Sequence, residues 1–506
     1  LTVAAVVILA LTSALTGPAG AATDWLQYIA SYEDLIRVFG ANPAAGQQHY
    51  LQYGQAEGRS LDLFDEDQYL RNYPDLQAAF GTDGAAATVH YIQYGFFEGR
   101  TATPPSASRN ILLLIADDLG VESTAFYPLR PGLQATVPPP PPMPNVARMA
   151  SAGLIFTNAW ANPLCAPTRA AIFTGRYGFR TGMGTNPNAN GVPALASSEV
   201  ILPEPFATRP DLNYLLGAIG KWHVSPGVTD PNTYGWPYYA GILPSRAGLE
   251  LYNSWKKDVN GTVNRSRVYA TTDQVEEAIG LIQTAERQGK RYFIQIAFNA
   301  PHNPYHVPPL DLHSYRLLPP YVPGAGSRPY FEAMVEALDT EIGRLLSQVS
   351  LSDTTVIFLG DNGTAGANLV PPYASARGKG ALYEPGIRIP LVVAGAGVAR
   401  PGRLVDGLVD TTDIFPTVLD LAGIAPPTGI TIDGVSMLPY LQDNPGGRRR
   451  AWAFSELFTS ATSSRRAIRN QTYKLITNGG RRELYNLPLD PMESTNLLAR
   501  PLSTTE

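Results

Sequence analysis

The chain has 506 residues, which is enough for two or three domains with a large buried core. Its hydrophobic fraction of 44% and its aromatic fraction of 10% are those of an ordinary globular protein. The net charge of −5 argues against a nucleic-acid-binding protein, which would be basic, so an anionic substrate has to be attracted by a local cluster of cations.

The N-terminal residues have the pattern of a secretory signal peptide. The apolar run Val3–Leu15 is too short to span a bilayer, and Ala19-Gly20-Ala21 forms a small-x-small cleavage site. We predict that residues 1–21 are a signal peptide and that the protein is exported to the periplasm, the cell surface or the medium. A buried apolar strand or helix is the alternative, and the missing basic segment leaves the true start residue open. No other stretch is long enough to span a membrane.

Residues 22–103 contain two copies of a 41-residue repeat. The segment Tyr32–Arg59 (YEDLIRVFG…HYLQYGQAEGR) returns as Tyr73–Arg100 (YPDLQAAFG…HYIQYGFFEGR). Repeats of this length are usually supersecondary units that stack on one another, and the apolar spacing predicts short helices. His49 and His90 occupy equivalent positions, where we expect packing histidines in preference to ligands. The repeat resembles short repeats beside exported bacterial enzymes, which implies attachment or secretion.

Residues 104–400 are predicted to form a catalytic α/β domain, which follows a linker at Pro104–Ser108. Three apolar runs read as buried parallel strands: Ile111–Ile115, Tyr292–Phe298 and Thr355–Leu359. The segments DQVEEAIGLIQTAE and YFEAMVEALDTEIGRLLSQV have helical spacing. Strands that alternate with helices indicate an α/β fold, with a mostly parallel sheet sandwiched by helices. Ligands bind such sheets beyond the carboxyl ends of the strands, where the polar residues of this chain collect.

Residues 401–506 have a different sequence pattern and are predicted to form a smaller C-terminal α+β subdomain. The segments RRAIRNQTYKLI and RRELYNLPLDPMESTNLL look like strands joined by turns. The expected architecture is therefore an N-terminal helical repeat region, an α/β core and this small subdomain.

The only cysteine of the chain lies in the sequence Cys165-Ala166-Pro167-Thr168-Arg169. A lone cysteine cannot form an internal disulfide, so it is either a small buried apolar residue or a chemically active group. This C-x-P-x-R stretch and the following TGR resemble the signature of type I, formylglycine-dependent sulfatases of the alkaline phosphatase superfamily. Six further segments resemble that family in its own order: ADDLG, GKWH, APH, GDNG, GKG…EPGIRIPL and ELYNLPLDP. The resemblance covers about residues 109–498, and Phe173 departs from it where the family usually has leucine.

The resemblance implies that a formylglycine-generating enzyme oxidises Cys165 to formylglycine (3-oxoalanine). The hydrated aldehyde would attack the sulfur of a sulfate ester with one hydroxyl and expel sulfate through the other. It also implies a divalent cation, usually Ca²⁺ with Mg²⁺ as the alternative, held by Cys165 and by hard oxygen donors. These donors are Asp117, Asp118, Asp361 and Asn362. Caps of the turns that follow the two strands are the alternative role for these residues.

The resemblance assigns roles to five further residues. Arg169 would steady the formylglycine, and Lys221 and Lys379 would hold sulfate oxygens. His223 would take the proton that lets sulfate leave, and His302 would protonate the leaving alcohol oxygen.

Two other functions stay open from the sequence. Some relatives in the superfamily keep the cysteine motif and act as phosphodiesterases or phosphonate hydrolases. The second alternative is an inactive sulfatase-like protein that binds a surface, although the complete set of site residues argues against it. The substrate is either a small aryl sulfate or a sulfated carbohydrate, and the aromatic segment 232–257 is either a surface that stacks on it or a packed insertion.

Overall fold

The computed structural model describes residues 24–98, 100, 102, 110–127, 139–187, 193–227, 230–242, 249–444, 447, 449–460 and 463–499. The predicted signal peptide and the predicted linker lie outside the described residues. The chain divides into two compact units, Leu1–Pro104 and Pro105–Glu506. Among the described segments, no helix has both the length and the apolar composition that a bilayer span requires.

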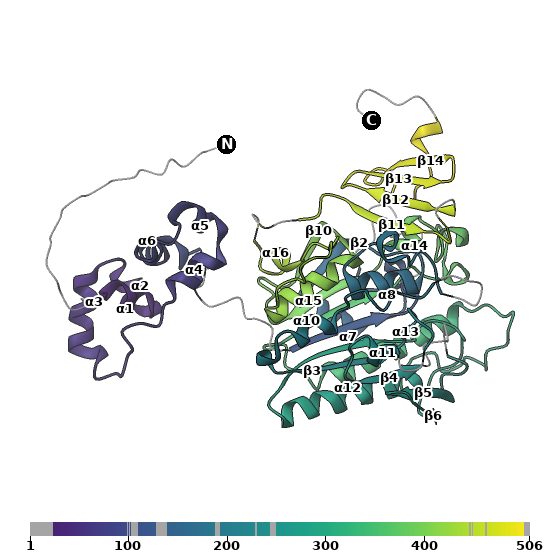
Figure 1. Ribbon diagram of the computed structural model, residues 1–506, viewed down its shortest axis with the longest axis horizontal. Coiled ribbons are helices and arrows are strands. Elements are labelled where there is room, and N and C mark those ends of the chain that lie inside the picture. The colour runs from purple at the N-terminus through teal and green to yellow at the C-terminus, as the bar shows by residue number, and fades with distance from the viewer. Residues whose placement is uncertain are drawn as a thin grey trace. The chain divides into compact units, whose positions relative to one another are not determined.

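The described part of the first unit is helical (Figure 1). Its helices are α1 (Trp25–Ala30), α2 (Glu33–Phe39), α3 (Pro43–His49), α4 (Glu66–Asn72), α5 (Pro74–Phe80) and α6 (Gly84–His90), with π-helical turns at Tyr50–Gly54 and Tyr91–Gly95. Nδ1 of His49 lies 3.0 Å from Oη of Tyr28, and Nδ1 of His90 lies 2.9 Å from Oη of Tyr69. Each histidine thus connects the third helix of its copy to the first.

The second unit is built on a ten-stranded sheet with the strand order β10-β2-β9-β8-β1-β7-β3-β4-β5-β6. Strands β8, β1, β7, β3 and β4 run parallel to one another, as do β10 and β2, whereas β9, β5 and β6 are antiparallel to their neighbours. The strands are β1 (Asn110–Ala116), β2 (Gly153–Trp160), β3 (Tyr214–Gly220), β4 (Tyr239–Ile242), β5 (Trp255–Val259), β6 (Thr262–Ser266), β7 (Arg291–Ala297), β8 (Thr354–Gly360), β9 (Leu391–Gly395) and β10 (Arg403–Asp410). The parallel centre is the one predicted from the alternation of strands and helices.

Helices cover both faces of this sheet (Figure 1). The helices of the second unit are α7 (Pro144–Ser151), α8 (Cys165–Thr174), α9 (Gly178–Thr181), α10 (Pro203–Ala207), α11 (Asp230–Thr233), α12 (Ala270–Arg287), α13 (Arg328–Leu346), α14 (Glu384–Ile387), α15 (Ile414–Ala422) and α16 (Leu438–Leu441). Residues of α8 and α15 pack in the core on one face, and residues of α7, α12 and α13 pack in the core on the other.

The central strands supply side chains to both cores in alternation. In β1, Ile111 and Leu113 pack with α8 and α15, whereas Leu112 and Leu114 pack with α12 and α13. A strand that is buried on both faces has no solvent side, so its sequence is a continuous apolar run. This is the physical reason that these strands are recognisable in the sequence.

A second, antiparallel sheet with the order β11-β12-β13-β14 ends the described chain. Its strands are β11 (Ala453–Leu457), β12 (Arg465–Arg469), β13 (Tyr473–Asn478) and β14 (Arg481–Asn486). It shares a small hydrophobic core with Trp160 at the end of β2. The predicted domain boundary at residue 401 stays a prediction. In the structure, β10 and α15 follow that residue and belong to the large sheet and its helical layer.

Candidate active site

Four neighbouring parallel strands end at one edge of the large sheet and are followed there by polar residues. In sheet order, β8 precedes Asp361 and Asn362, β1 precedes Asp117 and Asp118, β7 precedes His302, and β3 precedes Lys221 and His223. Because the strands are parallel, their carboxyl ends meet, and this brings together most of the predicted site residues from distant parts of the chain.

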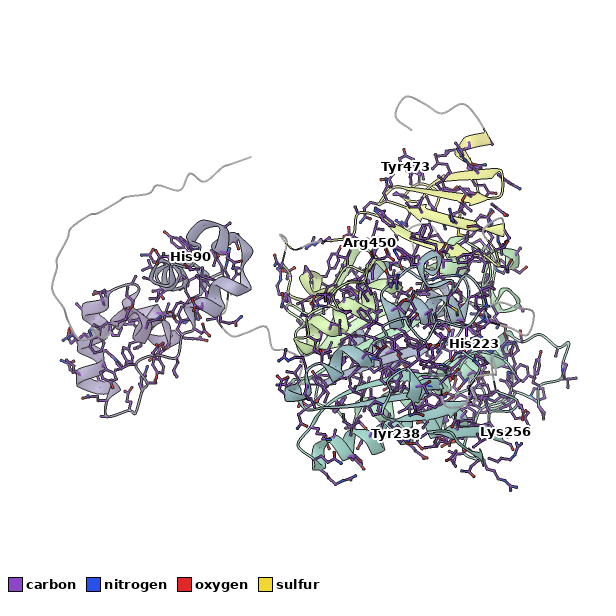
Figure 2. All side chains as sticks on the ribbon, viewed as in Figure 1. His90, His223, Tyr238, Lys256, Arg450 and Tyr473 are labelled. Atoms are coloured by element: carbon purple, nitrogen blue, oxygen red, sulfur yellow. The ribbon has the colours of Figure 1, made fainter. Side chains whose placement is uncertain are left out.

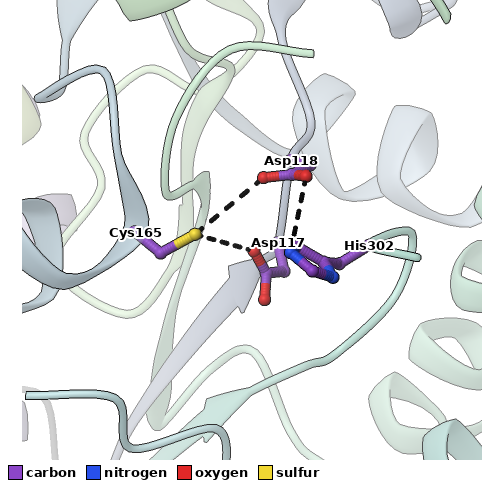
Figure 3. Close-up of side chains that lie close together, drawn as sticks. All are labelled: Asp117, Asp118, Cys165 and His302. Atoms are coloured by element: carbon purple, nitrogen blue, oxygen red, sulfur yellow. Dashed lines mark hydrogen bonds and ion pairs between the residues drawn. The ribbon is translucent and has the colours of Figure 1, made fainter. Parts of the chain in front are cut away.

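Cys165 is the first residue of α8, and its side chain lies at the same edge (Figure 3). The thiol donates to Oδ1 of Asp117 at 3.3 Å, and Nζ of Lys379 lies 3.4 Å from Sγ. Burial and then the neighbouring carboxylates raise the pKa of the Cys165 thiol well above its ordinary value. The encoded thiol is therefore protonated at neutral pH, and a protonated thiol is a poor nucleophile.

Asp117 is the centre of a fully buried charge network. Nζ of Lys221 lies 2.5 Å from Oδ2 of Asp117. Nη2 of Arg169 lies 3.7 Å from the same oxygen and 2.9 Å from Oδ2 of Asp361. Burial opposes ionisation of Asp117, but Lys221 and the other cations hold its pKa well below the usual range. Burial and the charge of Asp117 raise the pKa of Asp361 to about 6.

Asp118 contacts three further polar side chains of the site. Nζ of Lys379 lies 2.5 Å from Oδ1 of Asp118, and Nδ2 of Asn362 donates to the same oxygen at 2.8 Å. Nε2 of His302 lies 3.8 Å from Oδ2 of Asp118 (Figure 3). The φ angle of Asp118 is 69°, a left-handed conformation that is uncommon for a residue other than glycine. Such strained residues concentrate at functional sites, where the surrounding contacts hold them.

The two predicted catalytic histidines follow neighbouring strands. Nδ1 of His302 lies 2.7 Å from the carbonyl oxygen of Asn303, so the Nδ1 proton is bound there and Nε2 faces Asp118. His223 lies inside the second unit (Figure 2), and its buried Nδ1 has no hydrogen-bond partner among the described residues. Burial, followed by the charge of Lys221, lowers the pKa of both histidines.

Gly220 ends β3 and directs the chain into the site. Its φ is 92°, and a Cβ atom at this position would lie 2.0 Å from the carbonyl oxygen of Ala297 in β7. That oxygen instead accepts the backbone N–H of Lys221 at 2.8 Å. Only glycine permits this approach of two backbones, which positions Lys221 and His223 beside β7.

The oxygen donors at this edge have the chemistry that a hard divalent cation requires. One ligand atom from each of Asp117, Asp118, Cys165 and His302 lies within 4.8 Å of the others. Oδ1 of Asn362 is buried and has no hydrogen-bond partner among the described residues. An unpaired buried amide oxygen is costly, and a cation would satisfy it. Carboxylate and amide oxygens favour Ca²⁺ or Mg²⁺ over zinc.

The described residues of the Tyr- and Trp-rich segment 232–257 are mostly packed inside the second unit. Tyr238 is partly exposed, and the other five large rings are buried, with at most 7% exposure: Tyr234, Trp236, Tyr239, Tyr252 and Trp255. The alternative of an exposed surface that stacks on the substrate is therefore wrong for these five rings. His306 and His313 are likewise held in loop packing, by Oη of Tyr269 and by the carbonyl oxygen of Pro308 respectively.

Tyr252 has a role that the sequence did not suggest. Its Oη lies 2.6 Å from the carbonyl oxygen of Asn299 and 2.7 Å from that of His302. The hydroxyl thus holds the loop that carries His302. No local sequence pattern predicts this contact, because Tyr252 and His302 are far apart in the sequence.

Comparison with known proteins places this geometry in a family. The Sulfatase family model matches residues 109–424, and the model of the C-terminal region of N-sulphoglucosamine sulphohydrolase matches residues 377–505. The uncharacterized sulfatase YdeN of Escherichia coli (strain K12) is 30% identical over 335 residues, which are 60% of this chain and 58% of YdeN. N-acetylgalactosamine-6-sulfatase of Canis lupus familiaris is 29% identical over 375 residues, which are 66% of each chain.

A solved structure agrees with both relatives. The crystal structure of Ps i-CgsB has a TM-score of 0.65 and 25% sequence identity, and the match covers 77% of this chain and 88% of that one. The matched region spans 58% of the length of YdeN and 66% of that of the canine protein, which is less than two thirds of each. The Sulfatase model nevertheless matches more than half of this chain and includes every residue of the site described above. The chain therefore belongs to the sulfatase family.

Proposed function

We propose that this protein is an exported sulfatase that hydrolyses a sulfate ester of a carbohydrate through a formylglycine made from Cys165. The position of Cys165 carries the proposal. It is buried in the first turn of α8, and its Sγ lies 3.3 Å from Oδ1 of Asp117 and 3.4 Å from Nζ of Lys379. A nucleophile at this point lies next to carboxylates that can bind a metal and to a cation that can bind sulfate.

Conversion of Cys165 would replace a protonated thiol by a competent nucleophile. As a hydrated aldehyde, the residue would supply one hydroxyl that attacks sulfur and a second whose deprotonation releases sulfate. Arg169, on the same helix, would steady this residue. Its guanidinium is already fixed, because Nη1 donates to the carbonyl oxygen of Lys221 at 2.8 Å and Nη2 to Oδ2 of Asp361 at 2.9 Å.

Four oxygen donors would hold a divalent cation together with the modified Cys165. They are Asp117, Asp118, Asp361 and Asn362. The cation would lower the pKa of the attacking hydroxyl and offset the charge of the sulfate oxygens. The unpaired, buried Oδ1 of Asn362 supports this assignment, with Ca²⁺ as the first choice and Mg²⁺ as the second.

Lys221 and Lys379 would bind the sulfate oxygens. Each lysine is paired with a carboxylate at 2.5 Å, Lys221 with Asp117 and Lys379 with Asp118. Their positions are therefore fixed before a substrate arrives, and preorganised charges stabilise a developing anion without further rearrangement.

His302 and His223 would move the protons. The proton on Nδ1 of His302 is held by the carbonyl oxygen of Asn303, so Nε2 is the atom that would deliver a proton to the leaving alcohol oxygen, beside Lys379. His223 would accept the proton of the second hydroxyl as sulfate leaves. Both side chains follow neighbouring parallel strands, β7 and β3, so they lie at the same edge of the sheet as the carboxylates.

The relatives support a carbohydrate as the substrate. The canine relative is named for N-acetylgalactosamine 6-sulfate, and Ps i-CgsB has been crystallised with k-i-k-neocarrahexaose. A sulfated sugar of this kind would reach an exported enzyme outside the cell. A formylglycine-generating enzyme would act on the chain during maturation.

The decisive experiment is the mass of the tryptic peptide Met149–Arg169, with and without an amine that traps aldehydes. We expect a peptide lighter than the encoded one that gains the mass of the trap. Sulfate release from sulfated oligosaccharides should then fall by roughly 10³-fold or more in Cys165→Ser. A free thiol that persists after coexpression with a formylglycine-generating enzyme would contradict the proposal. Faster hydrolysis of 4-nitrophenyl phosphate than of 4-nitrophenyl sulfate would instead favour a phosphoesterase.

A further inference from the structure

A pocket of about 410 Å³ adjoins the candidate active site, and this volume is typical of sites for small ligands. Its lining includes Leu164 and Gly380, which are the direct sequence neighbours of Cys165 and Lys379. The backbone N–H of Gly380 donates to the carbonyl oxygen of Pro163 at 2.9 Å, so the segments that carry Cys165 and Lys379 meet at this part of the pocket wall.

Most of the remaining lining residues come from the end of β11, the start of β12 and the residues between them. Phe458 follows β11 and Arg465 begins β12, where Leu457 pairs with Arg465. The backbone N–H of Phe458 donates to the carbonyl oxygen of Gly184 at 3.0 Å. A Cβ atom at Gly184 would lie 2.3 Å from the ring of Phe458, so glycine is what allows the ring to lie directly against this loop. Phe458 is thus fixed to the loop that carries Gly184.

The lining combines three kinds of group. Phe458 offers a partly exposed aromatic ring, against which the C–H groups of a sugar can pack. Thr459 and Ser463 offer hydroxyls, which lie 2.8 Å apart. Arg465 offers a guanidinium, whose planar fork suits a sulfate or carboxylate.

Arg465 differs from the cations of the candidate active site because none of the described carboxylates pairs with it. Within the part of the chain that the structure describes, its side chain makes no hydrogen bond and no ion pair, although it is only partly exposed. The next residue, Arg466, lies 4.0 Å from Glu456 instead. An arginine that is held in a pocket wall without an internal partner can form charge-assisted hydrogen bonds with an anionic ligand.

We propose that this pocket binds the sugar unit next to the one that carries the cleaved ester, and that Arg465 recognises a second anionic group on that unit. The inference rests on the proposed function, because it places the cleaved ester at Cys165. The preferred substrate is then an oligosaccharide with at least two anionic groups, in which Phe458 contacts the sugar ring and Arg465 contacts the second sulfate or carboxylate.

Binding can be tested without turnover, in full-length protein that carries Cys165→Ser. The probes are pairs of disaccharides with one sugar backbone and either one or two sulfate groups, from carrageenan, chondroitin sulfate and heparan sulfate. We expect one disulfated disaccharide to bind about tenfold more tightly than its monosulfated partner, measured by isothermal titration calorimetry. Arg465→Gln should abolish this difference. Phe458→Ala should weaken both members of the pair equally and leave their ratio unchanged.

Arg482→Gln is the matched control, since Arg482 is an exposed arginine of the same sheet. It should leave both affinities unchanged. The inference is overturned if no pair shows a preference for the second sulfate, or if Arg465→Gln weakens both members of a pair by the same factor. Failure of the proposed function is visible separately, as a lack of aldehyde at Cys165 and of sulfate release by the unsubstituted protein.

Discussion

The hydroxyl of Tyr252 offers a sharp test of how the fold positions His302. In Tyr252→Phe the ring stays, so its packing against His306, with ring centroids 4.3 Å apart, is kept. What is lost is a hydroxyl within 2.6 and 2.7 Å of the carbonyl oxygens of Asn299 and His302. The carbonyl of Asn299 still accepts the backbone N–H of His302 at 2.9 Å. Among the described contacts, the carbonyl of His302 keeps no partner.

The magnitude follows from this one lost partner. A partly buried carbonyl that loses its hydrogen bond costs about 1–2 kcal/mol in the free energy of unfolding. In a unit of this size we expect a decrease in Tm of about 1–3 °C. The loop that carries His302 also loses its anchor, and an error of an ångström in the position of a proton donor reduces kcat strongly. We expect a loss of about tenfold in kcat, with KM changed less than twofold.

Thermal unfolding and the hydrolysis of 4-nitrophenyl sulfate measure the two effects. Tyr269→Phe is the matched control, because Oη of Tyr269 also contacts a loop histidine, Nε2 of His306 at 3.1 Å, but does not touch His302. It should lower Tm to a similar extent and leave kcat unchanged. Equal kcat values for Tyr252→Phe and the unsubstituted enzyme would refute the reasoning, as would equal losses of kcat in both variants.

Three further predictions concern other parts of the chain. Burial raises the pKa of Glu456 from 4.5 to about 7, so the folded state binds this proton more tightly and the free energy of unfolding falls as the pH rises through that interval. In Glu456→Gln this fall should be smaller by about 3 kcal/mol. The difference in Tm between pH 5 and pH 8 should shrink accordingly. A chelator should lower Tm, and Ca²⁺ should restore it. Asn362→Ala should raise the Ca²⁺ concentration that gives half of this recovery. An unchanged concentration would contradict the assignment of Asn362 to the metal site. In the helical unit, a Cβ atom at Gly95 would lie 1.9 Å from Oη of Tyr69, so Gly95→Ala should destabilise that unit by about 1–3 kcal/mol without altering sulfatase activity. Tyr69→Phe in the same chain should recover part of this loss, as circular dichroism would show.

Much of the fold could be predicted from local patterns. Strands β1, β7 and β8 are largely apolar because both faces of the large sheet are buried. Helices α12 and α13 show helical spacing because each presents one apolar side to that sheet. The pair Asp117-Asp118 after β1, the pair Asp361-Asn362 after β8 and His302 after β7 are recognisable in the sequence as well. They interrupt apolar runs at the points where the strands end.

The sequence by itself also determined which chemical groups are available: one cysteine in a C-x-P-x-R motif, two acidic strand ends, two lysines beside glycines and two histidines. It could not determine which of the aromatic residues are buried. Rings in segment 232–257 have the composition of a binding surface, and their burial depends on the elements that cover them.

Only the tertiary structure decided the neighbours of the site. The order β8-β1-β7-β3 brings Asp361, Asp117, His302 and Lys221 to one edge. Strand β12 places Arg465 in the same pocket as Leu164, the sequence neighbour of Cys165, although about three hundred residues separate the two in the sequence. The physical reason is that periodicity records only whether a side chain is buried. The group that lies next to it depends on the path of the whole chain.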